Sequence, residues 1–167
     1  LDSSDTEQCS CGSYGCAERL VSLSRLRRYI SQNPPPAQSP LSKISPGSVS
    51  LNHLFFASRQ NDPYAQSYVR YLADCFASLL RNVALTFNPE NVVFTGEYAI
   101  ADECFDNRIR EQFQQFHYLA SSTPIGIHYD TRNLPELDAR GGAFALLDHF
   151  FSDPQIYEDP EKQEAPQ

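Results

Sequence analysis

Hydrophobic side chains recur at helical spacing in two stretches of the chain. Between residues 18 and 30 the spacing predicts one helix of about three turns, with the apolar positions Leu20, Val21, Leu23, Leu26 and Ile30. A longer helix is predicted from residue 63 to about residue 86, because Asp62 can cap its free N–H groups and Pro63 occupies the tolerated first position. Its apolar stripe is wide enough for burial on more than one side and consists of Tyr68, Tyr71, Leu72, Cys75, Phe76, Leu79, Leu80 and Val83.

Two short apolar runs predict strands. The first covers residues 91–95 and the second residues 124–129, and helical patterns follow them at residues 100–117 and 138–151. The resulting order of helix, strand, helix, strand and helix is typical of a parallel α/β unit. Before this unit, Ser50 is expected to cap a short apolar helix that contains Leu51, Leu54, Phe55 and Phe56.

Three segments lack such patterns. Residues 1–8 are polar, and we expect them to be frayed. Residues 33–47 carry five prolines, which cannot occupy a helix interior, so this segment is predicted to be a surface loop. Residues 152–167 are acidic and contain proline, which predicts a disordered tail.

Composition and charge narrow the classes of function. The chain has 167 residues, enough for one domain with a hydrophobic core of its own, and 41% of them are apolar. A net charge of −8 argues against nucleic-acid binding by this chain alone, because such binding depends on Lys and Arg. No apolar run is long enough to span a membrane and no signal peptide is visible, so a cytoplasmic location is expected. The chain contains no Met and begins at Leu1, which indicates an excerpt from a longer protein.

Three cysteines within eight residues form the most informative motif. Between Cys11 and Cys16 lie Gly12 and Gly15, which allow the backbone to fold tightly enough to bring the sulfur atoms of Cys9, Cys11 and Cys16 together. Three thiolates suit zinc, although a tetrahedral site needs a fourth ligand and none lies nearby in the sequence. The alternative is disulfides or unused thiols. The odd total of five cysteines and the absence of a secretion signal count against disulfides, and core positions are expected for the other two, Cys75 and Cys104.

At this motif the chain resembles the ROK family of repressors, open reading frames and sugar kinases. The family pattern Cys-x-Cys-Gly-x-x-Gly-Cys-x-Glu is present in full at residues 9–18, and Ser22 supplies the small residue four positions later. The resemblance implies a structural zinc knuckle, whose fourth ligand is a histidine that would lie upstream of Leu1. It also implies that Glu18 contacts sugar hydroxyls, a task that suits the two acceptor oxygens of a carboxylate. Considered alone, Glu18 would be a solvated glutamate in the first turn of a helix.

The resemblance extends over about residues 9–151. Residues 57–65 resemble the family's Ala-x-x-Gly-Asp-x-x-Ala stretch, residues 87–94 its Asn-Pro entry to a strand, and residues 142–146 its C-terminal Gly-Ala helix. The fold implied is α/β, the helix-rich C-terminal lobe of an actin-like or RNase H-like ATPase domain, as one domain over residues 9–151.

The turn after the first strand bears on the choice between kinase and regulator. Sugar kinases of the family place two or three glycines here, which let the backbone approach the nucleotide. This chain has Thr95-Gly96-Glu97, a degenerate form of the kinase turn. Its Gly-Glu pair is similar to that of the family's repressors that respond to amino sugars; an ordinary turn between strand and helix is the alternative. The phosphate loop and catalytic aspartate of a kinase are also missing from the chain.

Three hypotheses follow. The first is the sugar-sensing and oligomerisation part of a transcriptional regulator, with a sugar or sugar phosphate as effector and a homodimer or homotetramer as assembly. The second is half of an ATP-dependent sugar kinase, and the third is a zinc-stabilised oligomerisation module without a ligand. For His117, His128 and His149 we expect ordinary surface or core positions instead of ligand roles.

Overall fold

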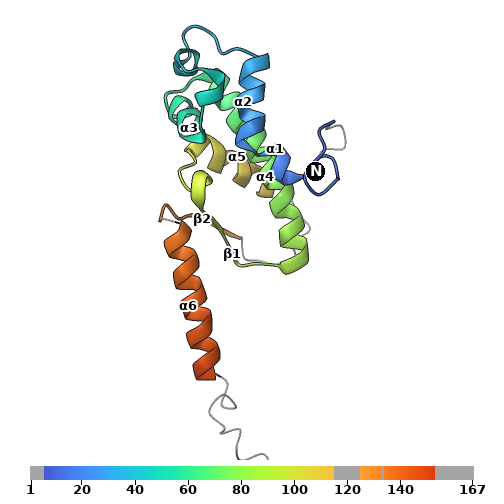
Figure 1. Cartoon of the computed structure of the whole chain (residues 1–167), viewed down its shortest axis with the longest axis vertical. Helices are drawn as coiled ribbons and strands as arrows, with labels where there is room; N and C mark the ends of the chain where they lie inside the picture. Colours follow the sequence, from blue (N-terminus) through green and yellow to red (C-terminus); the bar gives the residue numbers. More distant parts are fainter. Residues whose placement is uncertain (1–5, 115–124, 133, 153–167) are drawn as a thin grey trace, which may run out of the picture. The chain divides into compact units, whose positions relative to one another are not determined.

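The structure is a computed structural model that describes residues 6–114, 125–132 and 134–152. The chain divides into two compact units, one ending at Asp130 and the other beginning at Thr131. The first unit carries five helices, three short 3-10 turns and a two-stranded parallel sheet among its described residues (Figure 1). The expected α/β class is therefore confirmed at this level, whereas its assignment to the C-terminal lobe of an actin-like domain stays a prediction.

The first helical segment is broken in two. The single helix predicted over residues 18–30 is wrong, because α1 (Ala17–Leu20) and α2 (Leu23–Gln32) are separate helices. Between them, Ser22 has an extended backbone with ψ 149°, and its hydroxyl oxygen accepts a hydrogen bond from the backbone N–H of Arg25. A side-chain cap of this kind satisfies one of the free N–H groups at a helix start, so the second helix begins anew at this point.

The proline-rich segment leads from α2 to α3 (Leu51–Arg59) through two short 3-10 turns, η1 (Pro40–Lys43) and η2 (Pro46–Ser48). Ser50 caps α3 as predicted: its hydroxyl oxygen accepts from the backbone N–H of His53, whose ring nitrogen accepts from the Ser50 backbone in return. This reciprocal pair is a capping box, which fixes where the helix starts.

The longest helix, α4 (Pro63–Phe87), begins where the sequence predicts. One carboxylate oxygen of Asp62 accepts from the backbone N–H of Tyr64, and the other accepts from the hydroxyl of Ser39. The helix ends at Asn88, which adopts a left-handed conformation with φ 45°. Asp62 therefore both caps α4 and ties it to the segment that precedes α3.

A small parallel sheet follows α4. Strands β1 (Asn91–Phe94) and β2 (Gly126–Tyr129) pair in parallel with Asn91 opposite Gly126. Between them lie the 3-10 turn η3 (Gly96–Tyr98) and α5 (Glu103–Gln114), which packs beside α4 (Figure 1). The predicted order of helix, strand, helix and strand is thus confirmed in the described residues.

The start of α5 differs from the prediction. The pattern placed this helix from residue 100, but it begins at Glu103. The reason is Asp102, which is 6% exposed and whose carboxylate accepts from the backbone N–H of Phe105 at 3.1 Å. An aspartate in this position ends the preceding turn and starts the helix. Residues 115–117 of the predicted helix lie outside the described residues.

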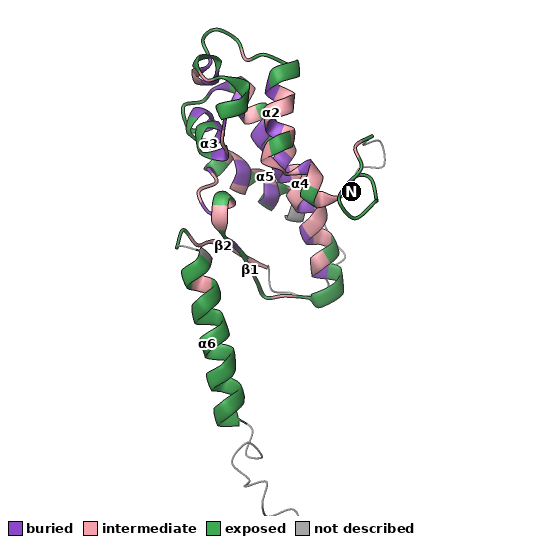
Figure 2. Ribbon diagram, in the orientation of Figure 1, coloured by how far each residue is buried: buried purple, intermediate pink, exposed green. Residues whose placement is uncertain are grey.

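The core of the first unit lies between α2, α3, α4 and α5 (Figure 2). It contains a group of aromatic rings in mostly edge-to-face contact, a favourable arrangement for aromatic side chains. These rings come from α3, α4, β1, η3 and α5 and belong to Phe55, Phe76, Phe94, Tyr98 and Phe105. These ring contacts hold together elements that are far apart in the sequence.

The second unit contains α6 (Leu134–Ser152), longer than the predicted helix over residues 138–151. Among its described side chains, large apolar groups are exposed, namely Phe144, Leu146, Leu147, Phe150 and Phe151. Residues 153–167, most of the expected acidic tail, lie outside the described residues, as do residues 1–5.

Candidate functional site

The cysteine segment folds into a tight loop before α1. The backbone N–H of Cys9 donates to the carbonyl of Ser13, and the N–H of Gly12 donates to the carbonyl of Cys9. Gly12 and Gly15 have φ of +83° and +66°, conformations that glycine adopts at little cost and L side chains rarely adopt. The two glycines are therefore required by the backbone geometry that gathers the cysteines.

The three sulfur atoms of this loop lie together, as the spacing predicts. The Sγ atoms of Cys9, Cys11 and Cys16 are within 4.8 Å of one another, and those of Cys11 and Cys16 are 3.5 Å apart. Around a tetrahedral zinc ion with Zn–S bonds of about 2.3 Å, sulfur ligands are separated by roughly 3.8 Å. The cluster thus has the donor set and spacing to supply three ligands to a metal ion. Among the described residues no fourth ligand joins them.

The thiols of this cluster differ in acidity. The backbone N–H of Ser13, followed by contacts with neighbouring side chains, lowers the pKa of Cys11 to about 7. The pKa of Cys16 is raised to about 11, first by its hydrogen bond with Cys11 and then by desolvation. Cys11 therefore ionises before Cys16, which is favourable for metal binding because the thiolate is the ligand.

Glu18 lies directly beside the sulfur cluster. It occupies the first turn of α1, for which Cys16 is the N-terminal flanking residue, and its side chain is exposed. Its carboxylate oxygen Oε2 lies 3.8 Å from Sγ of Cys9, which is buried. The residue that the family pattern singles out is thus in contact with one of the three cysteines.

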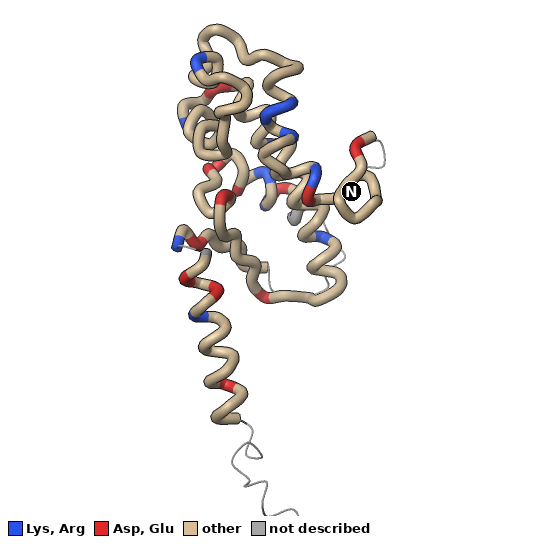
Figure 3. The backbone as a smooth tube through the Cα atoms, viewed as in Figure 1, with Lys and Arg blue, Asp and Glu red and all other residues tan. Residues whose placement is uncertain are grey.

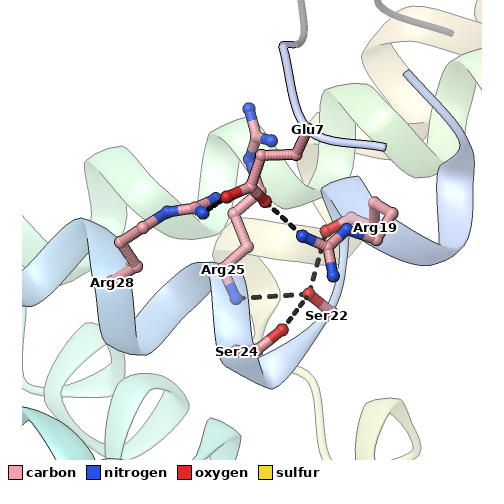
Figure 4. Close-up of polar contacts among 6 residues, drawn as sticks. All are labelled: Glu7, Arg19, Ser22, Ser24, Arg25 and Arg28. Carbon is pink, nitrogen blue, oxygen red and sulfur yellow. Dashed lines mark hydrogen bonds and ion pairs between the residues drawn. The ribbon is translucent and has the colours of Figure 1, made fainter. Parts of the chain in front are cut away.

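The corner between α1 and α2 is held by polar contacts (Figure 4). The hydroxyl of Ser22 donates to the carbonyl of Arg19, and the Glu7 carboxylate lies between the guanidinium groups of Arg19 and Arg28. Basic positions continue along α2 (Figure 3). These contacts fix the direction in which α1 leaves the loop.

The turn after β1 is the second predicted region. Gly96 has a φ of +64°, whereas Thr95 and Glu97 are exposed. Within this turn the sequence reasoning missed Tyr98, whose hydroxyl donates to the carbonyl of Val21 at 2.7 Å across 77 positions of sequence. A signal was present, since a tyrosine stands directly after the turn, but its partner could not be inferred from local spacing.

Of the candidate histidines, the structure describes the surroundings of one within the first unit. His128 contacts the side chain of Asn91 at 2.9 Å, His149 is on α6, and His117 lies outside the described residues. Cys75 and Cys104 are half-buried, on α4 and α5 respectively.

A polar cavity of about 710 Å³ lies between α3, α4 and α5, and the sequence did not indicate it. Three arginines and three acidic residues line it, together with other side chains; the charged set is Arg59, Arg70, Arg108, Asp102, Glu103 and Glu111. Arg108 is already paired with Asp74 through two hydrogen bonds. Cys104 also lines the cavity, but Glu18, Cys9, Cys11 and Cys16 do not.

Comparisons with known proteins agree on one family. The profile described as "ROK family" matches residues 2–149. A glucokinase of Thermotoga maritima is 32% identical over 107 residues, covering 62% of this chain and 34% of that protein. A glucokinase of Halalkalibacterium halodurans is 25% identical over 111 residues, covering 65% of this chain and 34% of that protein. The chain thus spans about a third of the length of these relatives.

Two solved structures are similar. One is a ROK family glucokinase from Streptomyces griseus in complex with glucose and AMPPNP, with TM-score 0.60 and 27% identity over 75% of this chain and 42% of that one. The other is a ROK family transcriptional regulator, a homologue of the Escherichia coli MLC protein, with TM-score 0.54 and 26% identity over 67% of this chain and 29% of that one. Among the described residues, no helix is long and apolar enough to cross a membrane.

Proposed function

The chain belongs to the ROK family, and on this basis we propose that it is the sugar-sensing and oligomerisation part of a transcriptional regulator. In this proposal Glu18 is the sugar contact, and Cys9, Cys11 and Cys16 form a structural zinc knuckle beside it. The observation that carries the proposal is the 3.8 Å contact between Cys9 Sγ and Glu18 Oε2. It links the cysteine cluster to an exposed acceptor group.

Glu18 has the chemistry of a sugar contact. An exposed carboxylate offers two oxygens that accept hydrogen bonds from neighbouring hydroxyl groups in defined directions. Its backbone is held on one side by the cysteine loop and on the other by buried Leu20, which is 1% exposed. A carboxylate on such a fixed backbone loses less conformational freedom on binding than one on a mobile loop.

Zinc at this site would be structural. Cys9, Cys11 and Cys16 would hold it as thiolates, with the fourth ligand supplied from outside the described residues. The ion would supply a stable cross-link of the loop, and no reaction step is assigned to it. The low pKa of Cys11 supports the proposal, because that thiol gives up its proton near neutral pH.

The turn at residues 95–97 favours the regulator over the kinase. Thr95 and Glu97 place side chains where a kinase needs close approach of the backbone to a nucleotide, and a carboxylate repels phosphate. The similar ROK regulator supports this choice. The second candidate function is a sugar kinase, which the two glucokinase relatives and the glucokinase structure favour.

The effector and assembly belong to the same proposal. The effector is a sugar or sugar phosphate, and the assembly is a homodimer or homotetramer. A zinc-stabilised oligomerisation module without a ligand is the third alternative, and it differs from the others in binding no sugar.

Titration of the full-length protein with D-glucose, N-acetyl-D-glucosamine and their 6-phosphates, with and without ATP, separates these functions. A regulator binds one of the four and releases no ADP, whereas a kinase phosphorylates glucose and releases ADP. Sugar-dependent ADP release would overturn the regulator in favour of the kinase. No binding of any of the four would leave the oligomerisation module.

A further inference from the structure

Tyr98 joins the turn after β1 to the helix that carries Glu18. Its hydroxyl donates to the carbonyl oxygen of Val21 at 2.7 Å, and Val21 is the residue that ends α1. Tyr98 is itself the last residue of η3. One hydrogen bond therefore connects two regions that are 77 positions apart in the sequence.

The ring of Tyr98 is fixed by the core. Its centroid lies 4.5 Å from that of Phe76, 5.9 Å from that of Phe105 and 6.2 Å from that of Phe55. Burial, reinforced by nearby Tyr68 and Glu97, raises the pKa of Tyr98 far above its usual range. The hydroxyl thus stays protonated at neutral pH and is available as a donor at one fixed place.

The other end of this bond is a weak element. The helix α1 has only four residues, and a single turn is not stable alone because its nucleation is costly. Val21 closes it with an N–H donated to the carbonyl of Ala17, while its own carbonyl accepts from Tyr98. Buried Leu20 supplies the apolar anchor of the same turn. Besides the polar contacts at the corner with α2, the direction of α1 therefore depends on the buried Leu20 side chain and on the bond from Tyr98.

We propose that Tyr98 is a positioning residue for Glu18: it holds the end of α1 against the aromatic core and thereby sets where the Glu18 carboxylate stands. This role rests on the proposed sugar contact of Glu18. It also links the turn at residues 95–97 to α1, because Tyr98 directly follows that turn and bonds to Val21.

A second buried tyrosine shows that burial alone does not require such a bond. The hydroxyl of Tyr68 is buried on α4 and has no hydrogen-bond partner among the described residues. By contrast, the hydroxyl of Tyr64 donates to the carbonyl of Asn33, the residue that ends α2. Tyr64 therefore makes the same type of bond to the end of a different helix, away from Glu18, and is the matched control.

The test compares full-length wild type, Tyr98→Phe, Tyr64→Phe, Glu18→Ala and the double variant Glu18→Ala/Tyr98→Phe. Isothermal titration with the four sugars named above measures affinity. Because one hydrogen bond is typically worth about 1 kcal/mol, Tyr98→Phe is expected to weaken sugar binding by about fivefold. Tyr64→Phe is expected to stay within about twofold of wild type, and Tyr98→Phe is expected to cause no further loss when Glu18 is already alanine.

Hydrogen exchange gives a second readout that needs no ligand. In Tyr98→Phe the amides of residues 19–22 are expected to exchange faster, whereas in Tyr64→Phe they keep the wild-type rate. Equal losses of affinity in the two single variants, or unchanged affinity and exchange in Tyr98→Phe, would overturn the role of Tyr98 alone. Unchanged affinity in Glu18→Ala, or no binding of any of the four sugars by wild type, would overturn the proposed function and this role with it.

Discussion

The thiol of Cys9 lies 3.8 Å from the carboxylate of Glu18, nine positions later in the sequence. Cys9 is buried and Glu18 is exposed, so the contact joins the inside of the cysteine loop to a surface group. The metal-binding capacity of the loop and the proposed sugar contact therefore belong to one structural unit. Substitutions at the cysteines should therefore change the affinity for sugar.

Replacing a cysteine of the cluster should reduce zinc content and sugar affinity together. We expect about one zinc ion per full-length chain in the wild type and less than about half in Cys9→Ser, because three sulfur ligands are reduced to two. Elemental analysis after dialysis measures the metal, and isothermal titration measures sugar binding. Cys75→Ser, on α4 and outside the cluster, serves as control and should retain both. Full zinc content in Cys9→Ser would contradict the assignment.

The thiols should react in a fixed order once the metal is removed. With a pKa of about 7, Cys11 is mainly thiolate at pH 8, whereas Cys16, at about 11, is mainly protonated. Since the thiolate is the reactive form, alkylation of Cys11 by iodoacetamide should rise with pH through about 7, before that of Cys16. Peptide mass spectrometry over a pH series measures both residues. Faster alkylation of Cys16 at pH 7 would contradict the order.

Adjacent phenylalanines on α3 should differ sharply in their effect on stability. Phe55 is fully buried among the aromatic rings, whereas Phe56 is 56% exposed. Phe55→Ala should therefore lower the free energy of unfolding by about 3–5 kcal/mol, because it leaves a cavity. Phe56→Ala should cost less than about 1 kcal/mol. Urea denaturation of the two variants measures the difference. Similar losses of unfolding free energy would contradict the burial of Phe55 in the core.

The break between α1 and α2 can be tested with two serines. Ser22→Ala removes the oxygen that accepts from the Arg25 N–H and should cost about 1 kcal/mol, as loss of a helix cap does. Ser24 is exposed and its hydroxyl contacts the Ser22 hydroxyl without capping a backbone N–H, so Ser24→Ala should cost much less. Thermal unfolding of both variants checks this. A larger loss for Ser24→Ala would mean that another residue caps α2.

Features that depend on neighbours in sequence could be predicted. The caps at Ser50 and Asp62, the cysteine cluster and the order of helices and strands all follow from local spacing, and the structure contains each of them. The division of the first helix at Ser22 was missed because its apolar positions keep a helical spacing across the break. The spacing of hydrophobic residues does not reveal a break that is caused by one capping residue.

Contacts between distant segments could not be predicted. The bond between Tyr98 and Val21, and the cavity between α3 and α5, depend on how helices pack once the chain has folded. A one-dimensional pattern carries no information on which distant residue will lie opposite a given side chain. The exposure of the apolar side chains of α6 could not be predicted either, because the hydrophobic pattern predicts a helix but not which of its side chains are buried.

The most direct test of the account is the sugar affinity of the full-length protein with and without the Glu18 carboxylate. Glu103→Ala is the matched control, because Glu103 is also an exposed glutamate in the first turn of a helix. We expect Glu18→Ala to lose at least about tenfold in affinity, as removal of a charged hydrogen-bonding group does, and Glu103→Ala to bind as wild type. Equal affinity of wild type and Glu18→Ala would contradict the central claim that Glu18 is the sugar contact.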